Sequence, residues 1–228
     1  MKIGVFGDSY ADKSFLRSDS PSIWYNFLKT EYNHTIECFG EGGSSILFSA
    51  ELIKKHAQNY DLIIWCVTTP GRFSLPHANG DRSYHVTTAN DKCKSNDIEV
   101  ITKHKICIDY LKYIFNWDTE NLVSKALISF IQQEYPNLLI IPCFPPPLGA
   151  EFNLYKLCSW ESNFYFPNQE IPEIYKNYYD MRPGHITVDN QKILAKLINN
   201  NLSPGIFQTS YSNFVQPQIP LEQVFKKR

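Results

Sequence analysis

Short apolar runs alternate with longer segments of helical periodicity along most of this chain. An apolar run of a few residues that ends at polar or turn residues is typical of a buried strand. Runs of this kind, which we predict to be strands, lie at residues 2–6, 34–39, 61–67 and 137–143. The run at 61–67 is the clearest of them, because it is continuous and rich in β-branched residues.

The segments between these runs carry apolar residues at helical spacing. We predict helices from Ser20-Pro21 through Leu28, and at residues 45–59, 96–115, 119–134 and 188–199. Serine and proline are common where a helix begins, and Thr187 or the turn before it could cap the last helix. Strands that alternate with helices favour a parallel sheet with helices on both faces, which is an α/β fold.

The length of 228 residues is consistent with one domain. We place this domain at residues 1–202, with a polar, turn-rich surface insertion at 77–94, and we expect 203–228 to be an extended, proline-bearing tail. A hydrophobic content of 43% is ample for a core.

Charge and cysteine content narrow the class of protein. The chain has 22 basic and 23 acidic residues, which favours neither nucleic acid nor an anionic membrane as a partner. We see no signal peptide and no apolar stretch long enough for a membrane span, so we expect a soluble cytoplasmic protein. None of the six cysteines forms a C-x-x-C pair, and we predict no metal and no cofactor.

Residues with catalytic potential lie where predicted elements begin or end. Gly7-Asp8-Ser9 follows the first strand directly, and ligands bind at the carboxyl ends of strands in open α/β sheets. A serine there can act as a nucleophile if a base lies beside it. His185, just before the last helix, is the candidate base, and Asp180, five residues before it, is the acidic residue that could orient it.

Acyl transfer also needs donors for the oxyanion. The backbone N–H of Ser9 and the Gly42-Gly43 backbone are candidates, because glycine allows the main chain to approach a ligand closely. Thr68, Thr69 or Arg72, at the end of the third strand, could add a side-chain donor. Arg72 and Asp8 are candidate substrate-binding residues, although Arg72 could instead form a structural ion pair, which we favour.

These motifs resemble the SGNH, or GDSL, hydrolases in content and in order along nearly the whole chain. Gly7-Asp8-Ser9 is similar to the first conserved block of that family, the glycine turn at 42–45 to the second, and His185 to the last. The resemblance implies a flavodoxin-like three-layer α/β/α sandwich. It also implies that Ser9 is the nucleophile, His185 the base and Gly43 the oxyanion glycine.

The chain departs from the family pattern at two positions. Thr69 stands closest to the place of the usual asparagine in the third block, and Arg182 stands three residues before His185, where the family usually has an aspartate. Asp180 could reach the imidazole through a longer loop, or it could pair with Arg182 or cap a turn. Without it the site would work as a Ser–His dyad, or a backbone carbonyl would orient the ring.

The resemblance implies a serine esterase that acts on small acyl groups, such as acetyl esters of a carbohydrate. The expected partner is a small-molecule or carbohydrate ester. Two alternatives keep the same fold: a glycan-binding module with a relict site, and a sugar O-acyltransferase.

Overall fold

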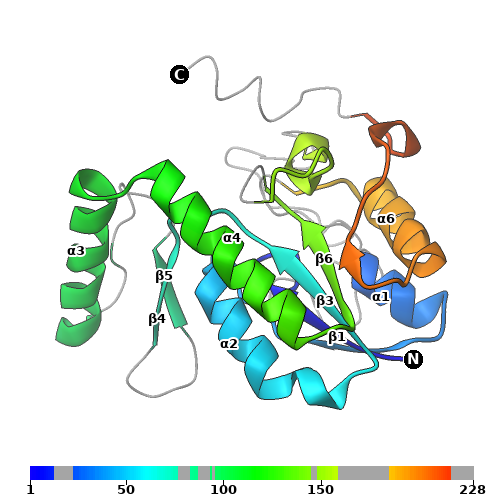
Figure 1. Cartoon of the computed structure of the whole chain (residues 1–228), viewed down its shortest axis with the longest axis horizontal. Coiled ribbons are helices and arrows are strands. Elements are labelled where there is room, and N and C mark those ends of the chain that lie inside the picture. Colours follow the sequence, from blue (N-terminus) through cyan, green and yellow to red (C-terminus); the bar gives the residue numbers. More distant parts are fainter. Residues whose placement is uncertain are drawn as a thin grey trace, which may run out of the picture.

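The structure is a computed structural model that describes residues 1–12, 23–76, 83–86, 93, 96–144, 148–158 and 185–216. Within these residues, the main sheet has five parallel strands in the order β2-β1-β3-β6-β7 (Figure 1). Its strands are β1 (Lys2–Gly7), β2 (Thr35–Cys38), β3 (Leu62–Val67), β6 (Leu138–Pro142) and β7 (Gly205–Ile206). Counted along the sheet this is the order 2-1-3-4-5, the doubly wound order of flavodoxin-like folds.

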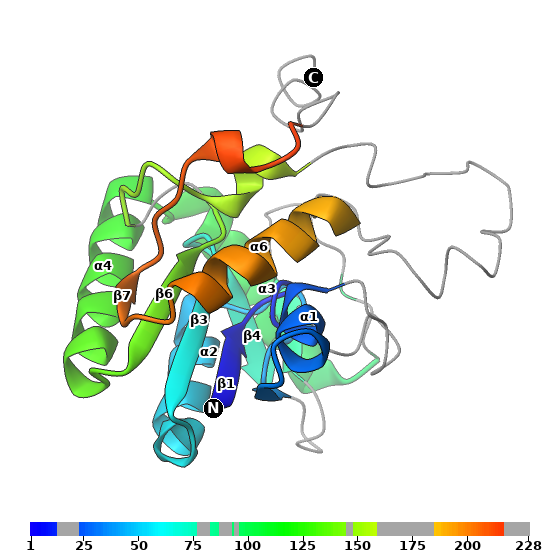
Figure 2. The same cartoon turned by 90° about the vertical axis from the view of Figure 1, so that its right-hand side faces the viewer.

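Helices cover both faces of the sheet, which makes a three-layer α/β/α sandwich (Figures 1 and 2). One face packs against α2 (Ile46–His56) and α4 (Trp117–Glu134), and the other against α1 (Trp24–Thr30) and α6 (Val188–Asn200). The side chains of β3 alternate between the two cores. Ile64 and Cys66 join the α1–α6 core, while Ile63, Trp65 and Val67 join the α2–α4 core.

The strands that we predicted from continuous apolar runs are confirmed as β1, β2, β3 and β6. The run is continuous in β3 and β6 because every side chain of these strands is buried on one face or the other. The predicted cap of α6 is also present, since the Thr187 hydroxyl accepts a hydrogen bond from the Asn190 N–H at 3.4 Å. The Ser20-Pro21 pair lies outside the described residues.

The expectation of an extended tail from residue 203 is wrong for residues 203–216. Gly205 and Ile206 form β7, which pairs with Leu139 and Ile140 of β6. Phe207 and Phe214 are buried in the α1–α6 core. This segment therefore belongs to the folded domain, while residues 217–228 lie outside the described part of the chain.

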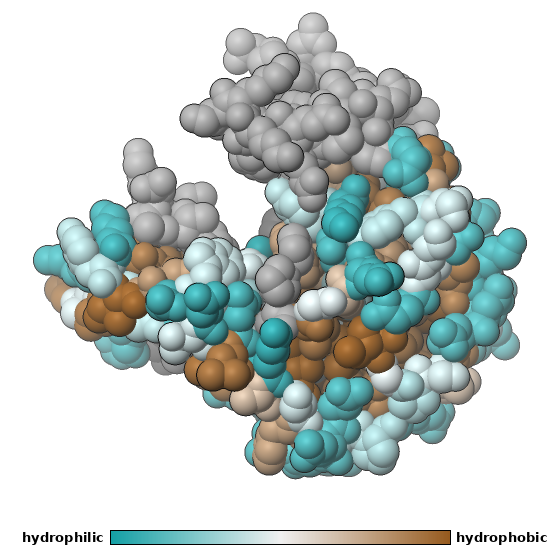
Figure 3. Space-filling model, turned by 45° about the horizontal axis from the view of Figure 1, so that its top comes forward, coloured by the Kyte–Doolittle hydropathy of each residue, from teal (hydrophilic) through white to brown (hydrophobic). Residues whose placement is uncertain are grey.

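A β-hairpin and a long helix form an arm beside the sandwich. The hairpin joins β4 (Phe73–Pro76) to β5 (Ser83–Val86), and α3 (Ile98–Tyr113) packs against it. Figure 3 shows this arm on the left, with brown patches among teal side chains. β5 falls within the predicted insertion at 77–94, whose Asn79-Gly80-Asp81 centre lies outside the described residues.

No helix in the described ranges is both long enough and apolar enough to cross a bilayer.

Candidate active site

The turn after β1 carries Ser9 out of the sheet at its carboxyl edge. Gly7 ends the strand with φ of 144°, a conformation that L side chains rarely adopt. A Cβ atom on Gly7 would lie 2.5 Å from the carbonyl oxygen of Cys66 on neighbouring β3. Only glycine therefore lets the chain turn here while it stays against β3.

Ser9 and His185 meet at this edge although 176 residues separate them. The Nε2 atom of His185 lies 2.8 Å from the Oγ atom of Ser9. Ser9 is partly exposed and His185 is buried. At this distance the imidazole can accept the hydroxyl proton, which is the geometry that a serine nucleophile requires.

Two local features hold His185 in place. Its neighbour Ile186 is buried in the α1–α6 core and forms an antiparallel bridge with Cys158. Two residues after His185, the side chain of Thr187 caps α6, so the backbone on that side is anchored to the helix N-terminus.

Tyr10 packs beside the imidazole, and the sequence alone did not predict this contact. Its ring centroid lies 4.8 Å from that of His185, and its hydroxyl oxygen lies 2.8 Å from the Cys158 sulfur. Burial, and secondarily the nearby Cys158 and Cys143, raise the pKa of Tyr10 well above its ordinary value. Tyr10 therefore stays a neutral phenol that links the Ser9 turn to the segment bridged to Ile186.

Asp8 is buried completely and its carboxylate is used inside the protein. Its Oδ2 atom accepts hydrogen bonds from Arg72 Nη1 at 2.7 Å and from Thr68 Oγ1 at 2.9 Å. Its Oδ1 atom accepts one from the Tyr10 N–H at 3.2 Å. The prediction that Asp8 binds substrate is wrong, because a fully buried carboxylate with these partners is closed to a ligand.

Arg72 forms the structural ion pair that we favoured. Its guanidinium pairs with Asp8 and lies over the ring of Phe144, 4.8 Å from the centroid. The ion pair joins the segment between β3 and β4 to the turn that carries Ser9. Arg72 is still partly exposed and lines a groove beside the site.

The glycine turn at 40–45 is attached to the turn after β1. The Asp12 carboxylate accepts a hydrogen bond from the Gly42 N–H at 2.6 Å, and the Ser44 hydroxyl donates one to the Gly7 carbonyl at 3.1 Å. Because the Gly42 N–H is committed to Asp12, Gly43, with φ of 83°, is the better oxyanion candidate in this turn. No role for Asp12 was predicted from the sequence.

Thr68 and Thr69 have different environments at the end of β3. Thr68 is buried and donates to Asp8, whereas Thr69 is partly exposed and lines the same groove as Arg72. Of the two, Thr69 is the hydroxyl that a ligand could reach. Asp180 and Arg182 lie outside the described residues, so the orienting role of Asp180 stays a prediction.

In the described part of the chain, no group of three or more His, Cys, Asp or Glu side chains is placed to hold a metal ion.

Comparison with known proteins adds a distant likeness to solved structures. No family model matches the chain, and no curated protein sequence is similar to it. Among solved structures, the acetyl xylan esterase AlAXEase is similar at 14% sequence identity and a TM-score of 0.35. The alignment covers 90% of this chain and 76% of that one. A likeness at this level says nothing about function, so the site residues carry the proposal that follows.

Proposed function

We propose that this chain is a serine hydrolase that cleaves carboxylic esters through an acyl-enzyme intermediate. The observation that carries the proposal is the 2.8 Å distance between Ser9 Oγ and His185 Nε2 at the carboxyl edge of the sheet. In this proposal Ser9 is the nucleophile and His185 is first the general base and then the general acid.

The reaction has two halves. His185 takes the hydroxyl proton as Ser9 Oγ attacks the ester carbonyl carbon, and the imidazolium then gives this proton to the departing alcohol. Water attacks the acyl-enzyme in the second half, with His185 again as base, and releases the carboxylic acid and Ser9. The N–H groups of Ser9 and Gly43 are the proposed donors to the oxyanion, with the Thr69 hydroxyl as a third donor.

The imidazole needs an orienting group on its other side. We assign this role to Asp180, whose carboxylate would fix the tautomer and stabilise the imidazolium. The packing of Tyr10 against the ring supports the same orientation by contact.

The substrate part of the proposal rests on the resemblance of the motifs alone. The first substrates to test are esters with small acyl groups, acetyl above all, on a carbohydrate alcohol.

The test compares Ser9→Ala and His185→Ala with the parent in hydrolysis of p-nitrophenyl acetate. Each change removes a reacting group, so kcat should fall by about a thousandfold or more. Ser212→Ala is the matched control, because Ser212 is an exposed serine near the chain end whose hydroxyl pairs with Ser210. Equal rates in Ser9→Ala and in an active parent would overturn the proposal.

The replacement of the usual asparagine by Thr69 favours, as a second candidate, a glycan-binding module with a relict site. A fluorophosphonate probe separates the two, since a hydrolase gains one adduct on Ser9 by intact mass and a binding module gains none. Product analysis with an added sugar acceptor separates hydrolysis from the remaining alternative, acyl transfer to a sugar.

A further inference from the structure

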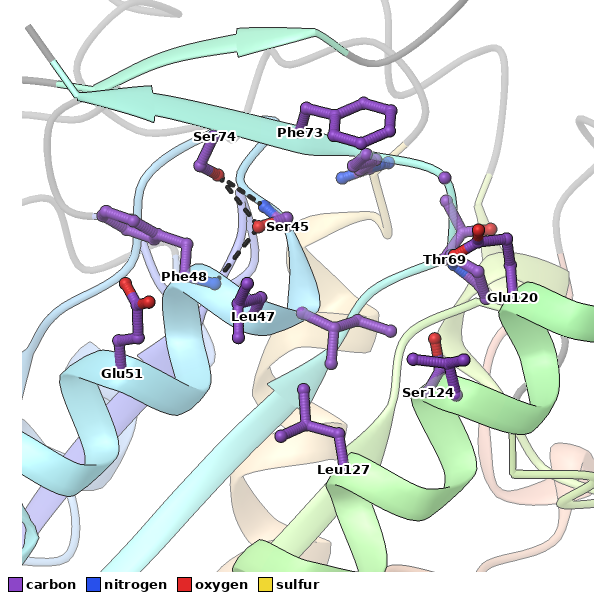
Figure 4. A pocket seen from close by; sticks show the side chains of 15 residues that line it. Ser45, Leu47, Phe48, Glu51, Thr69, Phe73, Ser74, Glu120, Ser124 and Leu127 are labelled. Carbon is purple, nitrogen blue, oxygen red and sulfur yellow. Dashed lines mark hydrogen bonds between the residues drawn. The ribbon is translucent and has the colours of Figure 1, made fainter. Parts of the chain in front are cut away.

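The turn at residues 40–45 carries the proposed oxyanion donor Gly43 and lies between β2 and α2. Its far end is fixed by Ser45, which caps α2. The Ser45 hydroxyl accepts hydrogen bonds from the Phe48 N–H and the Ser74 hydroxyl, each at 3.1 Å, and the Ser45 N–H donates to Ser74 Oγ at 2.9 Å (Figure 4). The helix cap and the start of β4 therefore hold this end of the turn.

The near end of the turn lies against residues 11 and 12. Asp12 and Gly40 form a parallel bridge, and a Cβ atom on Gly40 would lie 2.4 Å from the carbonyl carbon of Ala11. Contact this close leaves no room for a side chain, so glycine is needed where the two segments meet. The Glu41 N–H also donates to the Gly7 carbonyl, at 3.3 Å.

The Asp12 carboxylate makes a charged contact between the two segments. Its Oδ2 atom accepts the Gly42 N–H at 2.6 Å, and the residue is only 3% exposed. A hydrogen bond to a carboxylate is shorter and roughly twice as strong as one between neutral groups. The backbone of Asp12 is fixed as well, because its carbonyl accepts the hydroxyl of Tyr25 on α1 at 3.0 Å. The carboxylate is therefore a buried acceptor with a fixed position.

Gly43 lies between these two anchored ends. Its φ of 83° is easily reached by glycine, but glycine has so many accessible conformations that the residue does not fix its own direction. The Asp12 contact holds the N–H of the residue directly before it. The Ser44 hydroxyl, on the residue directly after it, donates to the Gly7 carbonyl at 3.1 Å. The direction of the Gly43 N–H is thus set by the contacts of its neighbours.

An oxyanion donor is effective when it already points at the oxyanion before the reaction begins, because no energy is then spent on reorientation. Loss of the Asp12 acceptor would release the peptide plane next to that of the Gly43 N–H. Removal of one oxyanion donor lowers kcat by about a hundredfold to a thousandfold, so a donor that is loosened but still present should cost less, about tenfold. The contact needs an acceptor atom, and the side-chain oxygen of an asparagine can accept the same N–H.

We infer that Asp12 is a positioning residue that holds the Gly43 N–H in the direction that the oxyanion requires. The inference rests on the proposed function, in which this N–H is a donor to the oxyanion. It assigns the rigidity of the oxyanion site to a carboxylate three residues after the nucleophile. Asp12 acts through Gly42 and does not touch the substrate.

The experiment compares Asp12→Ala and Asp12→Asn with the parent in hydrolysis of p-nitrophenyl acetate and in inhibition by phenylboronic acid. The boron atom of this inhibitor bonds to Ser9 Oγ while the hydroxyl proton passes to His185, and a boronate oxygen takes the place of the oxyanion. Asp12→Ala should lower kcat about tenfold, change KM less than about twofold and raise the inhibition constant about tenfold. Asp12→Asn keeps an acceptor and should stay within about threefold of the parent in all three constants.

Asp61→Ala is the matched control. The Asp61 carboxylate also accepts a backbone N–H, that of Lys2 at 2.7 Å, but it does so at the opposite end of β1. Its kcat and inhibition constant should stay those of the parent. If Asp12→Ala does not fold, Asp12→Ser takes its place, because the shorter serine side chain withdraws the acceptor from the Gly42 N–H and should change the constants in the same direction.

Three outcomes would overturn the inference while leaving a Ser9-dependent esterase in place. The variant without the acceptor could keep the parental kcat and inhibition constant and lose only stability in urea, it could raise KM alone, or Asp12→Asn could lose as much activity as Asp12→Ala. Failure of the proposed function is a different result, namely activity on acetate that survives Ser9→Ala.

Discussion

The rings of Tyr10 and His185 lie against each other, with centroids 4.8 Å apart and planes inclined by 38°. Tyr10 is buried and its hydroxyl is tied to Cys158, so its ring forms a fixed wall for the imidazole. This contact joins the turn after β1 to the segment before α6, and it makes Tyr10 a positioning residue for the proposed base.

Tyr10→Phe should retain activity within about threefold, because the ring stays while one hydrogen bond, worth about 1 kcal/mol, is lost. Tyr10→Ala should lower kcat about tenfold or more with little change in KM, since a misplaced base slows proton transfer more than substrate binding. Steady-state kinetics with p-nitrophenyl acetate measures both parameters. A loss in Tyr10→Phe as large as that in Tyr10→Ala would contradict the role of the ring.

The Asp8–Arg72 ion pair should contribute to stability, because removal of one partner leaves the other charge buried and unpaired. We expect Arg72→Gln to lower the free energy of unfolding by about 3 kcal/mol. Asp8→Asn combined with Arg72→Gln should be less destabilised than the sum of the single changes, as contacting residues are coupled. Urea unfolding of the four proteins measures the coupling, and strictly additive changes would refute it.

Stability should fall at alkaline pH because burial raises the pKa of Tyr10 and of the Cys143 thiol. Both groups keep their protons in the folded state above the pH at which they ionise in the unfolded chain, so the unfolded state binds fewer protons. Each group then lowers the free energy of unfolding by up to about 1.4 kcal/mol per pH unit, from about pH 9–10 upward.

Tyr10→Phe should reduce this alkaline slope by one group. The measurement is the urea midpoint between pH 8 and pH 11 for the parent and the variant. If the two curves stay parallel over this range, Tyr10 does not contribute to the alkaline loss of stability and the prediction is wrong.

Gly7 should tolerate no side chain. Gly7→Ala places a Cβ atom 2.5 Å from a β3 carbonyl oxygen at a positive φ, and we expect a loss of at least about 3 kcal/mol in stability. Gly149→Ala is the matched control, because Gly149 also has positive φ, at 62°, but a methyl group there would meet no atom of a more distant residue within 4 Å. Only the backbone cost of about 1–2 kcal/mol should remain there. Similar losses in both variants, measured by thermal unfolding, would argue against the steric explanation.

The strands that could be predicted most clearly are those buried on both faces, although β2, whose side chains alternate between exposed and half-buried, was predicted too. Every side chain of β3 and β6 is buried, so every position is apolar and the continuous pattern is easy to recognise. β7 has two residues, and neither of them is buried. The buried residue of this segment is Phe207, which follows the strand. The sequence therefore has no strand pattern here. β5 lies in a polar, turn-rich stretch of the sequence, where no apolar run indicates a strand.

The site residues that could be predicted are those that lie directly at the end of a strand or the start of a helix. Ser9 follows a strand and His185 precedes a helix, and the topology brings such ends to one edge. Tyr10 and Asp12 were not predictable in this way, because their roles depend on contacts with Cys158 and Gly42 that only the folded chain creates. The one available signal was that both follow Ser9 within three residues.

The pairing of α1 with α6 also bears on how the chain is made. The α2–α4 face of the sheet can close once residues up to about 140 have left the ribosome, whereas the opposite face waits for α6, some sixty residues later. Until then Ile64, Cys66, Leu139 and Ile141 lack the part of this core that α6 supplies, namely Leu194, Ala195 and Ile198. During this interval the nascent chain exposes apolar side chains of the α1–α6 core to solvent. Aggregation and chaperone binding are expected at this stage of synthesis.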